Sequence, residues 1–326
     1  MSTLFLTDDD VRTVFDWCAA IDALRAAYSA PDDPARFPSR TMARAEGRWL
    51  RTLSGISAGG LMGAKLIAAS IATRRASYLI SLFDQETVEL VALLDGNSVT
   101  GFRTAATSAL AVDVLAPHEP LRVGVIGSGF EAQHHVRALA AARALSAVTV
   151  FSPNPASRAR FLDRLADLAL PMTAADGAPE AVAGADLVVC AARARDEQPT
   201  LCGAWLEPGM TVVSIGSTLP EQRELDTEAI ARADVIVADN AAEVAHDTGD
   251  LIAASRAGVD LAGKIVSLAD VVSGRMPGRP STEAVVVYKS VGSAVQDLAV
   301  AGMCVRRAAT AQAGTVVPVG VSPVLK

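Results

Sequence analysis

This sequence of 326 residues lacks several features that mark particular classes of protein. It is 51% hydrophobic but only 4% aromatic, so its hydrophobic cores must be built largely from Ala, Val and Leu. No apolar run reaches the length of about 20 residues that a membrane-spanning helix needs. The acidic stretch Met1–Asp10 is unlike the basic and then apolar start of a secretory signal. We therefore expect a cytoplasmic protein with no membrane partner.

Basic clusters and closely spaced cysteines are also absent. The net charge is −7 and no basic block is present, which argues against a nucleic-acid partner because binding phosphates needs clustered Lys and Arg. The cysteines are scattered without CxxC spacing, at Cys18, Cys190, Cys202 and Cys304. This spacing favours reduced thiols over disulfides or a zinc site. His134 and His135 are adjacent on one expected helix, where their side chains point about 100° apart, so no metal site is expected.

The most informative stretch runs from Leu121 to Gln133. An apolar run up to Ile126 predicts a short buried strand, and a helix is expected over Glu131–Ala142. Between them lies a GxGxxA turn with the residues Gly127, Ser128, Gly129, Phe130 and Ala132. In such turns the first glycine permits the tight bend, the second lets a pyrophosphate approach, and the small third residue keeps helix and strand close. We therefore expect a dinucleotide at the start of this helix, where free N–H groups face phosphates.

Two patterns divide the chain. Consecutive strands with short turns, which favour antiparallel pairing, are expected over 39–43, 48–54, 61–70, 77–83 and 88–94. A helix then runs to residue 115, and beyond it strands alternate with helices, as in a doubly wound parallel sheet. These later strands are expected over 147–152, 186–191, 211–215, 235–238 and 282–287, with a helix over 156–169 and a long helix over 289–307. The fold class is α/β, with a Rossmann-type domain over residues 117–307 and a smaller α+β domain over residues 1–116, to which a tail from about 308 to 326 returns.

The end of the second strand in the parallel sheet decides the type of cofactor. In an NAD site an acidic residue there binds the ribose 2′-hydroxyl, whereas an NADP site supplies cations or hydroxyls instead. The segment 151–158 contains no Asp or Glu. Four of its side chains can reach a phosphate: Ser152, Asn154, Ser157 and Arg158. The segment therefore favours NADP(H), with NAD(H) as the open alternative. A plainer interpretation is a capped helix with a solvent-facing Arg158.

Several segments together resemble the ornithine cyclodeaminase and mu-crystallin family. They are 103–111 after the antiparallel strands, 127–132 in the glycine turn, 216–226, and 289–292 with Gln296 and Asp297. The resemblance covers nearly the whole chain. It implies a homodimer in which the first domain supplies the dimer interface and much of the substrate pocket.

The resemblance also implies a set of site residues. Family chemistry turns on carbon–nitrogen bonds next to a carboxylate, which requires cations for the carboxylate and a proton donor or acceptor near nitrogen. Arg40, Lys65 and Arg103 match the family's basic pocket residues. The two arginines can grip a carboxylate in bidentate fashion, while Lys65 is a point donor whose pKa burial would lower. Each can instead have a structural role, at the surface, at a strand edge or within its own helix. Further cofactor contacts are expected at Thr104, Gly216, Ser217 and Gly292.

Thr218 departs from the pattern of true ornithine cyclodeaminases. By resemblance, those enzymes carry an Asp two residues beyond the glycine that here is Gly216, and it acts as a base on the substrate amine. A hydroxyl has no useful basicity at neutral pH, but it can hydrogen-bond an imine nitrogen or orient a water. Imine reductases of the family resemble this sequence better, so Thr218 joins Lys65 as a candidate catalytic residue. The alternative is that the Thr218 hydroxyl only satisfies the loop backbone. Asp226 is expected to cap or precede a helix and is not a substitute for the missing acid.

We therefore expect an NADP(H)-dependent oxidoreductase that reduces an α-imino acid, such as a cyclic ketimine carboxylate, to an amino acid. Hydride would pass from nicotinamide C4 to the imine carbon while Lys65, or a water held by it, protonates or polarises the nitrogen. One alternative is an ornithine cyclodeaminase or an amino acid dehydrogenase working in the oxidative direction. Another is a noncatalytic, mu-crystallin-like NADP(H)-binding protein. The expected partners are a small imino or amino acid and a second copy of the chain.

Overall fold

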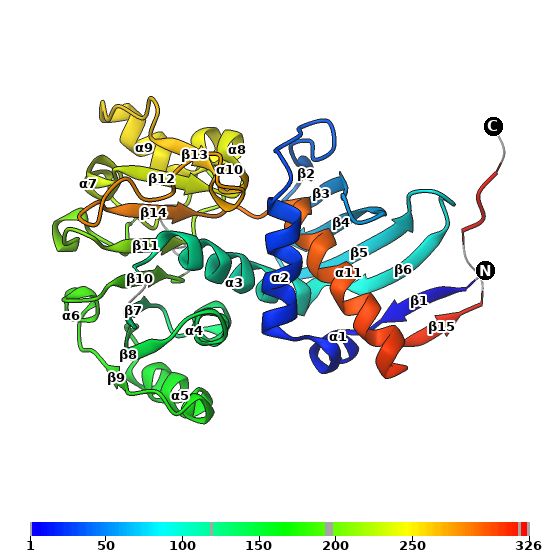
Figure 1. Ribbon diagram of the computed structural model, residues 1–326, viewed down its shortest axis with the longest axis horizontal. Helices are drawn as coiled ribbons and strands as arrows, with labels where there is room; N and C mark the ends of the chain where they lie inside the picture. Colours follow the sequence, from blue (N-terminus) through cyan, green and yellow to red (C-terminus); the bar gives the residue numbers. More distant parts are fainter. Residues whose placement is uncertain (1, 118–119, 193–197, 319–320, 325–326) are drawn as a thin grey trace. The chain divides into compact units, whose positions relative to one another are not determined.

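A computed structural model describes residues 2–117, 120–192, 198–318 and 321–324 (Figure 1). The chain forms two compact units, one made of residues 1–103 and 293–326 and the other of residues 104–292. These units divide the chain near residues 103 and 292, where we expected boundaries near 116 and 307. The difference at the second boundary arises because helix α11 (Ala294–Ala311) packs against helix α2 (Trp17–Tyr28) and the sheet of the first unit.

The first unit is built on a seven-stranded sheet with the order β15-β1-β6-β5-β4-β3-β2. The strands are β1 (Thr3–Leu6), β2 (Thr41–Ala45), β3 (Arg48–Ile56), β4 (Leu61–Ser70), β5 (Arg75–Asp84), β6 (Leu90–Asp95) and β15 (Thr315–Val317). Strands β2 to β6 pair antiparallel with their neighbours in sequence, as expected. Strand β1 was not expected, because four residues are too short to show an alternating pattern. It pairs parallel with β6 and antiparallel with β15, which brings the C-terminal strand back to this sheet.

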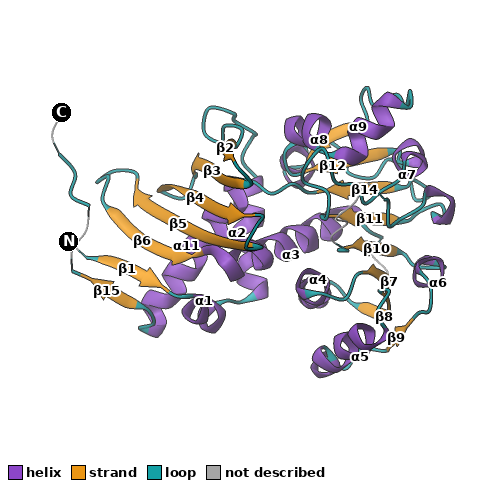
Figure 2. Ribbon diagram, turned by 180° about the vertical axis from the view of Figure 1, so that it is seen from behind, coloured by secondary structure: helices purple, strands orange, loops and turns teal. Residues whose placement is uncertain are grey.

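Helices cover one face of this sheet. They are α1 (Asp8–Val14), α2 and α11, with α3 (Gly96–Leu115) following the last antiparallel strand. Thr7 caps α1, since its hydroxyl accepts from Asp10 N at 3.2 Å. Because side chains alternate along a strand, Leu53, Lys65 and Ile80 share the helix-covered face. Figure 2, seen from behind, shows that no helix among the described residues of this unit covers the opposite face.

The second unit confirms the doubly wound parallel sheet. Its eight strands pair in parallel in the order β13-β12-β14-β11-β10-β7-β8-β9. The strands are β7 (Leu121–Ile126), β8 (Leu145–Phe151), β9 (Met172–Ala174), β10 (Leu187–Cys190), β11 (Thr211–Ser214), β12 (Val235–Ala238), β13 (Ile265–Ser267) and β14 (Val286–Lys289). The α-helices that follow α3 are α4 (Phe130–Ala142), α5 (Pro155–Arg164), α6 (Ala178–Val182), α7 (Thr227–Arg232), α8 (Ala241–Asp247), α9 (Gly249–Arg256) and α10 (Leu268–Val272). Its strands bury mainly Val and Ile, which matches the low aromatic content.

Three expected elements are misplaced. The strand expected over 282–287 is β14, which starts at Val286 and ends at Lys289. The long helix expected from Lys289 therefore begins only at Ala294, because Lys289 is a fully buried strand residue paired with Ser214 and Ala238. The helix expected over 156–169 ends at Arg164 and continues as a short 3₁₀ turn. None of the helices in the described ranges is long and apolar enough to cross a membrane.

Candidate functional site

Lys65 is buried in the middle of the first unit. It lies on β4, opposite Leu53 of β3 and Ile80 of β5, with 1% of its surface exposed. Its Nζ donates to Asp297 Oδ1 of α11 at 2.7 Å, and Asp297 is fully buried. A buried ammonium is costly unless it has a partner, so this ion pair explains how the core accommodates the charge.

Arg103 shares the same carboxylate. The Arg103 Nε lies 3.1 Å from Asp297 Oδ1, and the Arg103 Nη1 donates to Gln296 Oε1 at 2.6 Å. The Gln296 amide in turn donates to the hydroxyl of Tyr28 at 2.9 Å. These bonds fix the orientation of the Arg103 guanidinium. We call Arg40, Lys65, Arg103 and Asp297 the cationic cluster.

Within the cationic cluster the pKa of Lys65 is lowered to about 8. Burial is the largest cause, and the positive charges of Arg103 and Arg40 lower the pKa further, while Asp297 opposes the shift. Arg40 precedes β2 and is half-buried, close enough for its charge to act on Lys65. The three expected basic residues therefore gather in the first unit. An amine with a pKa near 8 exchanges its proton readily near neutral pH.

Three polar members of this environment were not predicted as site residues. Gln296 and Asp297 entered only as part of the family resemblance, and Tyr28 did not enter at all. A signal for Asp297 was present, because an acid in an otherwise apolar helix must be buried with a cation. Tyr28 ends an amphipathic helix and has no comparable signal in the sequence.

The glycine turn of the second unit has the geometry of a phosphate-binding turn. Gly127 has φ +113°, and a Cβ there would lie 2.6 Å from the Ala191 carbonyl oxygen, so only glycine fits. Gly129 caps the start of α4, and a Cβ there would meet nothing within 4 Å. Ala132 is fully buried. The open space at Gly129 leaves room for a ligand at the helix N-terminus.

Two serines meet where β7 and β8 end. Ser128 Oγ and Ser152 Oγ are 2.9 Å apart, and the Ser152 carbonyl accepts from Arg158 at 2.9 Å. The Arg158 side chain is only 11% exposed, and its guanidinium also donates to Asp176 Oδ1 at 3.0 Å. The interpretation of Arg158 as a solvent-facing residue is therefore wrong, because these bonds hold it over the strand end.

The other two polar residues of this segment have local partners. Asn154 caps α5, where its Oδ1 accepts from Ala156 N at 2.9 Å, so the capped-helix interpretation is right for this residue. Ser157 Oγ accepts from Arg160 at 2.7 Å. These contacts lie at the N-terminus of α5 and within it.

The loop after β11 is held by hydrogen bonds between its own residues. Gly216 N donates to Glu224 Oε2 at 2.8 Å, and a Cβ on Gly216 would collide with that carboxylate. Ser217 Oγ donates to the Gln222 carbonyl at 2.6 Å. The Thr218 hydroxyl lies 3.5 Å from Gln222 Oε1, so it faces a side-chain amide rather than the backbone.

A buried polar network supports this loop. Burial raises the pKa of Glu224 to about 7. Ser214 Oγ bridges Glu224 and Lys289, and Lys289 Nζ also lies 2.9 Å from Asp250 Oδ2. The network joins the ends of β11 and β14 to the loop.

The remaining expected residues lie in the same unit. Gly292 N donates to Asp239 Oδ2 at 2.8 Å, which fixes the turn after β14. Thr104 is buried in α3, where its carbonyl accepts from Ser108 Oγ at 3.0 Å. Asp226 caps α7 by accepting from Ala229 N at 2.7 Å, as expected.

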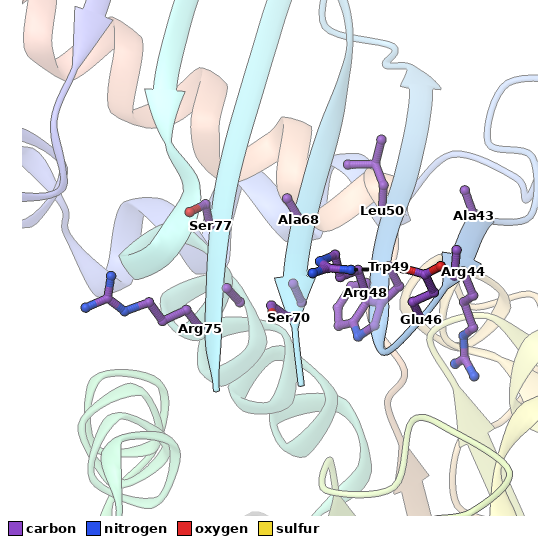
Figure 3. A pocket seen from close by; sticks show the side chains of 13 residues that line it. Ala43, Arg44, Glu46, Arg48, Trp49, Leu50, Ala68, Ser70, Arg75 and Ser77 are labelled. Carbon is purple, nitrogen blue, oxygen red and sulfur yellow. Dashed lines mark hydrogen bonds and ion pairs between the residues drawn. The ribbon is translucent and has the colours of Figure 1, made fainter. Parts of the chain in front are cut away.

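A separate hollow of about 570 Å³ lies at the ends of β2 to β5 in the first unit (Figure 3). Figure 3 shows Leu50, Ala68 and Ser77 on three neighbouring strands, with Arg48 and Glu46 paired at 3.4 Å. No member of the cationic cluster lines it. Within the described ranges, no three His, Cys, Asp or Glu side chains gather as metal ligands would.

Comparison with known proteins agrees with this architecture. The ketimine reductase mu-crystallin of Mus musculus is 30% identical over 71% of this chain and 69% of its own length. A Delta(1)-pyrroline-2-carboxylate reductase of Paracoccus denitrificans is 29% identical over 93% of this chain and 96% of its own. The solved structure of Thermococcus litoralis Delta(1)-pyrroline-2-carboxylate reductase in complex with NADH and L-proline is 25% identical. It covers 96% of this chain and 99% of its own, with a TM-score of 0.88.

A family profile gives the same answer. The profile of the ornithine cyclodeaminase/mu-crystallin family matches residues 60–312, which is most of the chain and includes Lys65, Arg103, the glycine turn and Asp297. The chain therefore belongs to the ornithine cyclodeaminase/mu-crystallin family.

Proposed function

We propose that this protein reduces α-imino acids to amino acids with a reduced nicotinamide cofactor. The observation that carries the proposal is the buried Lys65 beside Arg103, with a lysine pKa of about 8. This pairing supplies both a cation for a carboxylate and a proton for an adjacent nitrogen. The names of the mouse and Paracoccus relatives, a ketimine reductase and a pyrroline-2-carboxylate reductase, support the same chemistry.

The residues of the cationic cluster have different roles toward the substrate. A guanidinium carries its N–H donors in a planar fork, so Arg103 can engage Asp297 and a substrate carboxylate together, with Arg40 as the second cation. Lys65 donates its proton to the imine nitrogen, so that a lysine N–H bond breaks as a substrate N–H bond forms. When bound, the nicotinamide supplies the hydride that the imine carbon accepts. The role of Thr218 as a hydrogen bonder to nitrogen or water stays a prediction.

We also propose that NADP(H) is the preferred cofactor. Ser128 and Ser152 present hydroxyls at the ends of β7 and β8, and Arg158 bonds the Ser152 carbonyl with no acid in segment 151–158. The open space at Gly129 suits a pyrophosphate at the start of α4. NAD(H) is the alternative, and the NADH bound in the Thermococcus structure supports that alternative.

The reductase proposal predicts a clear preference among substrates. Purified protein is expected to oxidise NADPH in the presence of pyrroline-2-carboxylate or piperideine-2-carboxylate. It is expected to release little or no ammonia from ornithine with either NAD or NADP, because Thr218 cannot act as the base that cyclodeamination needs. Absorbance at 340 nm and an ammonia assay measure the two reactions.

Two outcomes would contradict the proposal. Ammonia and proline formed from ornithine at a rate comparable with imine reduction would favour the cyclodeaminase alternative. Tight NADPH binding without turnover of any imine or amino acid would favour a noncatalytic, mu-crystallin-like binding protein.

We further propose that two copies of the chain dimerise through the uncovered sheet face. Alternation along the strands places a set of apolar side chains on the side opposite the helices. This outer sheet face consists of Leu50, Ile56, Met62, Leu66, Leu79, Phe83 and Leu93. Leu50 is 47% exposed and Ile56 42%, and so large an apolar surface on one sheet is typical of an interface. The surface continues into the hollow of Figure 3 through Leu50.

Leu79→Glu is expected to weaken dimerisation by about a hundredfold, because it buries an unpaired carboxylate in a sheet-to-sheet contact. Leu79 is 39% exposed and lies on the central strand β5 next to Leu66. Sedimentation velocity at micromolar concentration measures the change. Ala26→Glu, an exposed position on α2 on the other side of the sheet, is the matched control. A wild-type monomer, or an unchanged dimer in Leu79→Glu, would rule out this interface.

A further inference from the structure

Asp297 is held in an unusual electrostatic position. It lies in the first turn of α11 and is fully buried. Its Oδ1 accepts hydrogen bonds from both Lys65 Nζ at 2.7 Å and Arg103 Nε at 3.1 Å. Its Oδ2 makes no hydrogen bond within the part of the chain that the structure describes. All the hydrogen bonding of this carboxylate is thus directed at the two cations proposed to handle the substrate.

The groups around Lys65 shift its pKa in opposite directions. Burial among Leu53 and Ile80 removes water from the ammonium, and Arg103 and Arg40 repel it. The carboxylate of Asp297, which lies in the first turn of α11, opposes these effects and raises the pKa of Lys65. Tyr28 of α2 reaches this environment through Gln296, whose amide donates to the Tyr28 hydroxyl. Asp297 is the one negative charge among the groups named here.

We propose that Asp297 is the positioning residue of Lys65, which holds its Nζ in place and keeps it protonated in the pH range where the enzyme works. The kinetic part of this inference rests on the proposed reductase function, whereas the titration of Lys65 does not. In this role Asp297 needs no contact of its own with substrate or cofactor. It acts through Lys65 and, by the same oxygen, fixes the guanidinium of Arg103.

The arrangement also accounts for the return of the proton. After Lys65 has given its proton to the substrate nitrogen, the neutral amine still donates a hydrogen bond to Asp297. The guanidinium of Arg103 remains hydrogen-bonded to the same carboxylate oxygen, at 3.1 Å. The amine then regains a proton from water, and the ion pair is restored.

The test is the Asp297→Asn variant, which keeps the size of the side chain and removes its charge. We expect the pKa of Lys65 to fall by about one to two units, because the loss of a paired charge leaves burial and two arginines unopposed. The chain has only four lysines, Lys65, Lys264, Lys289 and Lys326, so NMR of isotope-labelled lysine Cε and Nζ can follow each one. Comparison with Lys65→Arg assigns the signal.

Reduction needs protonated Lys65, so kcat/KM falls as pH rises through the lysine pKa. In Asp297→Asn this alkaline limb is expected to move to lower pH by the same one to two units. At pH 8 the protonated fraction of Lys65, and the rate with it, then falls by about fivefold to fiftyfold, with a smaller loss at pH 6.

Two further variants make the result decisive. Asp297→Glu keeps the charge, so the pKa of Lys65 is expected to stay within about half a unit of wild type. Asp250→Asn removes the carboxylate of another fully buried Lys–Asp pair, 2.9 Å from Lys289, and is expected to leave Lys65 unchanged.

An unchanged Lys65 titration in Asp297→Asn would overturn the inference, even if activity were lost. If Asp297→Asn does not fold, a fall of more than one unit in Asp297→Glu would overturn it as well. A wild-type protein that reduces no imine would refute the proposed function while leaving the NMR test of Asp297 intact.

Discussion

Replacing Lys65 with alanine is expected to lower kcat for imine reduction by about a hundredfold to a thousandfold, the usual loss for one electrostatic donor at a reacting atom. NADPH binding is expected to stay close to wild type. The glycine turn and the β8 end that we assign to the cofactor belong to the second compact unit, whereas Lys65 belongs to the first. Steady-state kinetics with pyrroline-2-carboxylate and fluorescence titration with NADPH measure the two quantities.

Stability must be measured with activity in this variant. Removing one partner of a buried ion pair costs about 3–5 kcal/mol, because the other charge is left without compensation. Here Asp297 keeps its hydrogen bond from Arg103, which limits that loss. Lys65→Met preserves more of the buried volume and separates the loss of the amine from the loss of packing.

Lys264→Met is the matched control for the loss of a lysine. Lys264 is on the second unit, where its Nζ donates to the carbonyls of Ala231 and Ala233. We expect its kcat to stay within about twofold of wild type. A folded Lys65→Ala that retained most of its activity would show that the lysine is structural, and the proposed proton transfer would then be wrong.

Replacing Ser152 with aspartate is expected to shift the preference from NADPH toward NADH by roughly a hundredfold, equivalent to a few kcal/mol. Ser152 is buried at the end of β8, 2.9 Å from Ser128 Oγ and in contact with Arg158. A carboxylate there would repel a 2′-phosphate and compete for Arg158. In an NAD site the same carboxylate would accept hydrogen bonds from the ribose hydroxyls.

The ratio of kcat/KM for NADPH to that for NADH measures this shift. Thr173→Asp is the control, because it adds the same charge to an exposed position on the neighbouring strand β9. We expect little change in the ratio for that variant. The assignment of NADP(H) does not survive if Ser152→Asp keeps the wild-type ratio.

Much of the fold could be predicted because its signals are local. The apolar run before Gly127 and the GxGxxA turn identify a βα unit within some twenty residues, and the period of alternation distinguishes the antiparallel strands from the helices. The missed strand β1 and the misplaced β14 mark the limit of this reasoning. Strand β1 is defined by its partners β6 and β15, and β14 extends to Lys289 because a lysine can be buried beside Asp250.

The candidate site was likewise predictable only in part from the sequence. The types of residue that the chemistry needs, Arg40, Lys65 and Arg103, were named from the sequence through the family resemblance. The contact between Lys65 and Asp297 was not predicted, because 232 positions separate the two residues along the chain. No periodicity reports such a contact, which arises only when α11 packs on β4.

The sequence by itself thus determined the fold class, the glycine turn and the absence of an acid at the end of β8, since each depends on neighbouring residues. The tertiary structure alone decided which charges are buried together. It paired Lys65 and Arg103 with one carboxylate and placed Arg158 over the strand end instead of in solvent. The physical reason is that the pKa of a buried group depends on its dielectric surroundings and on charges a few ångströms away, and both are set by packing between distant segments.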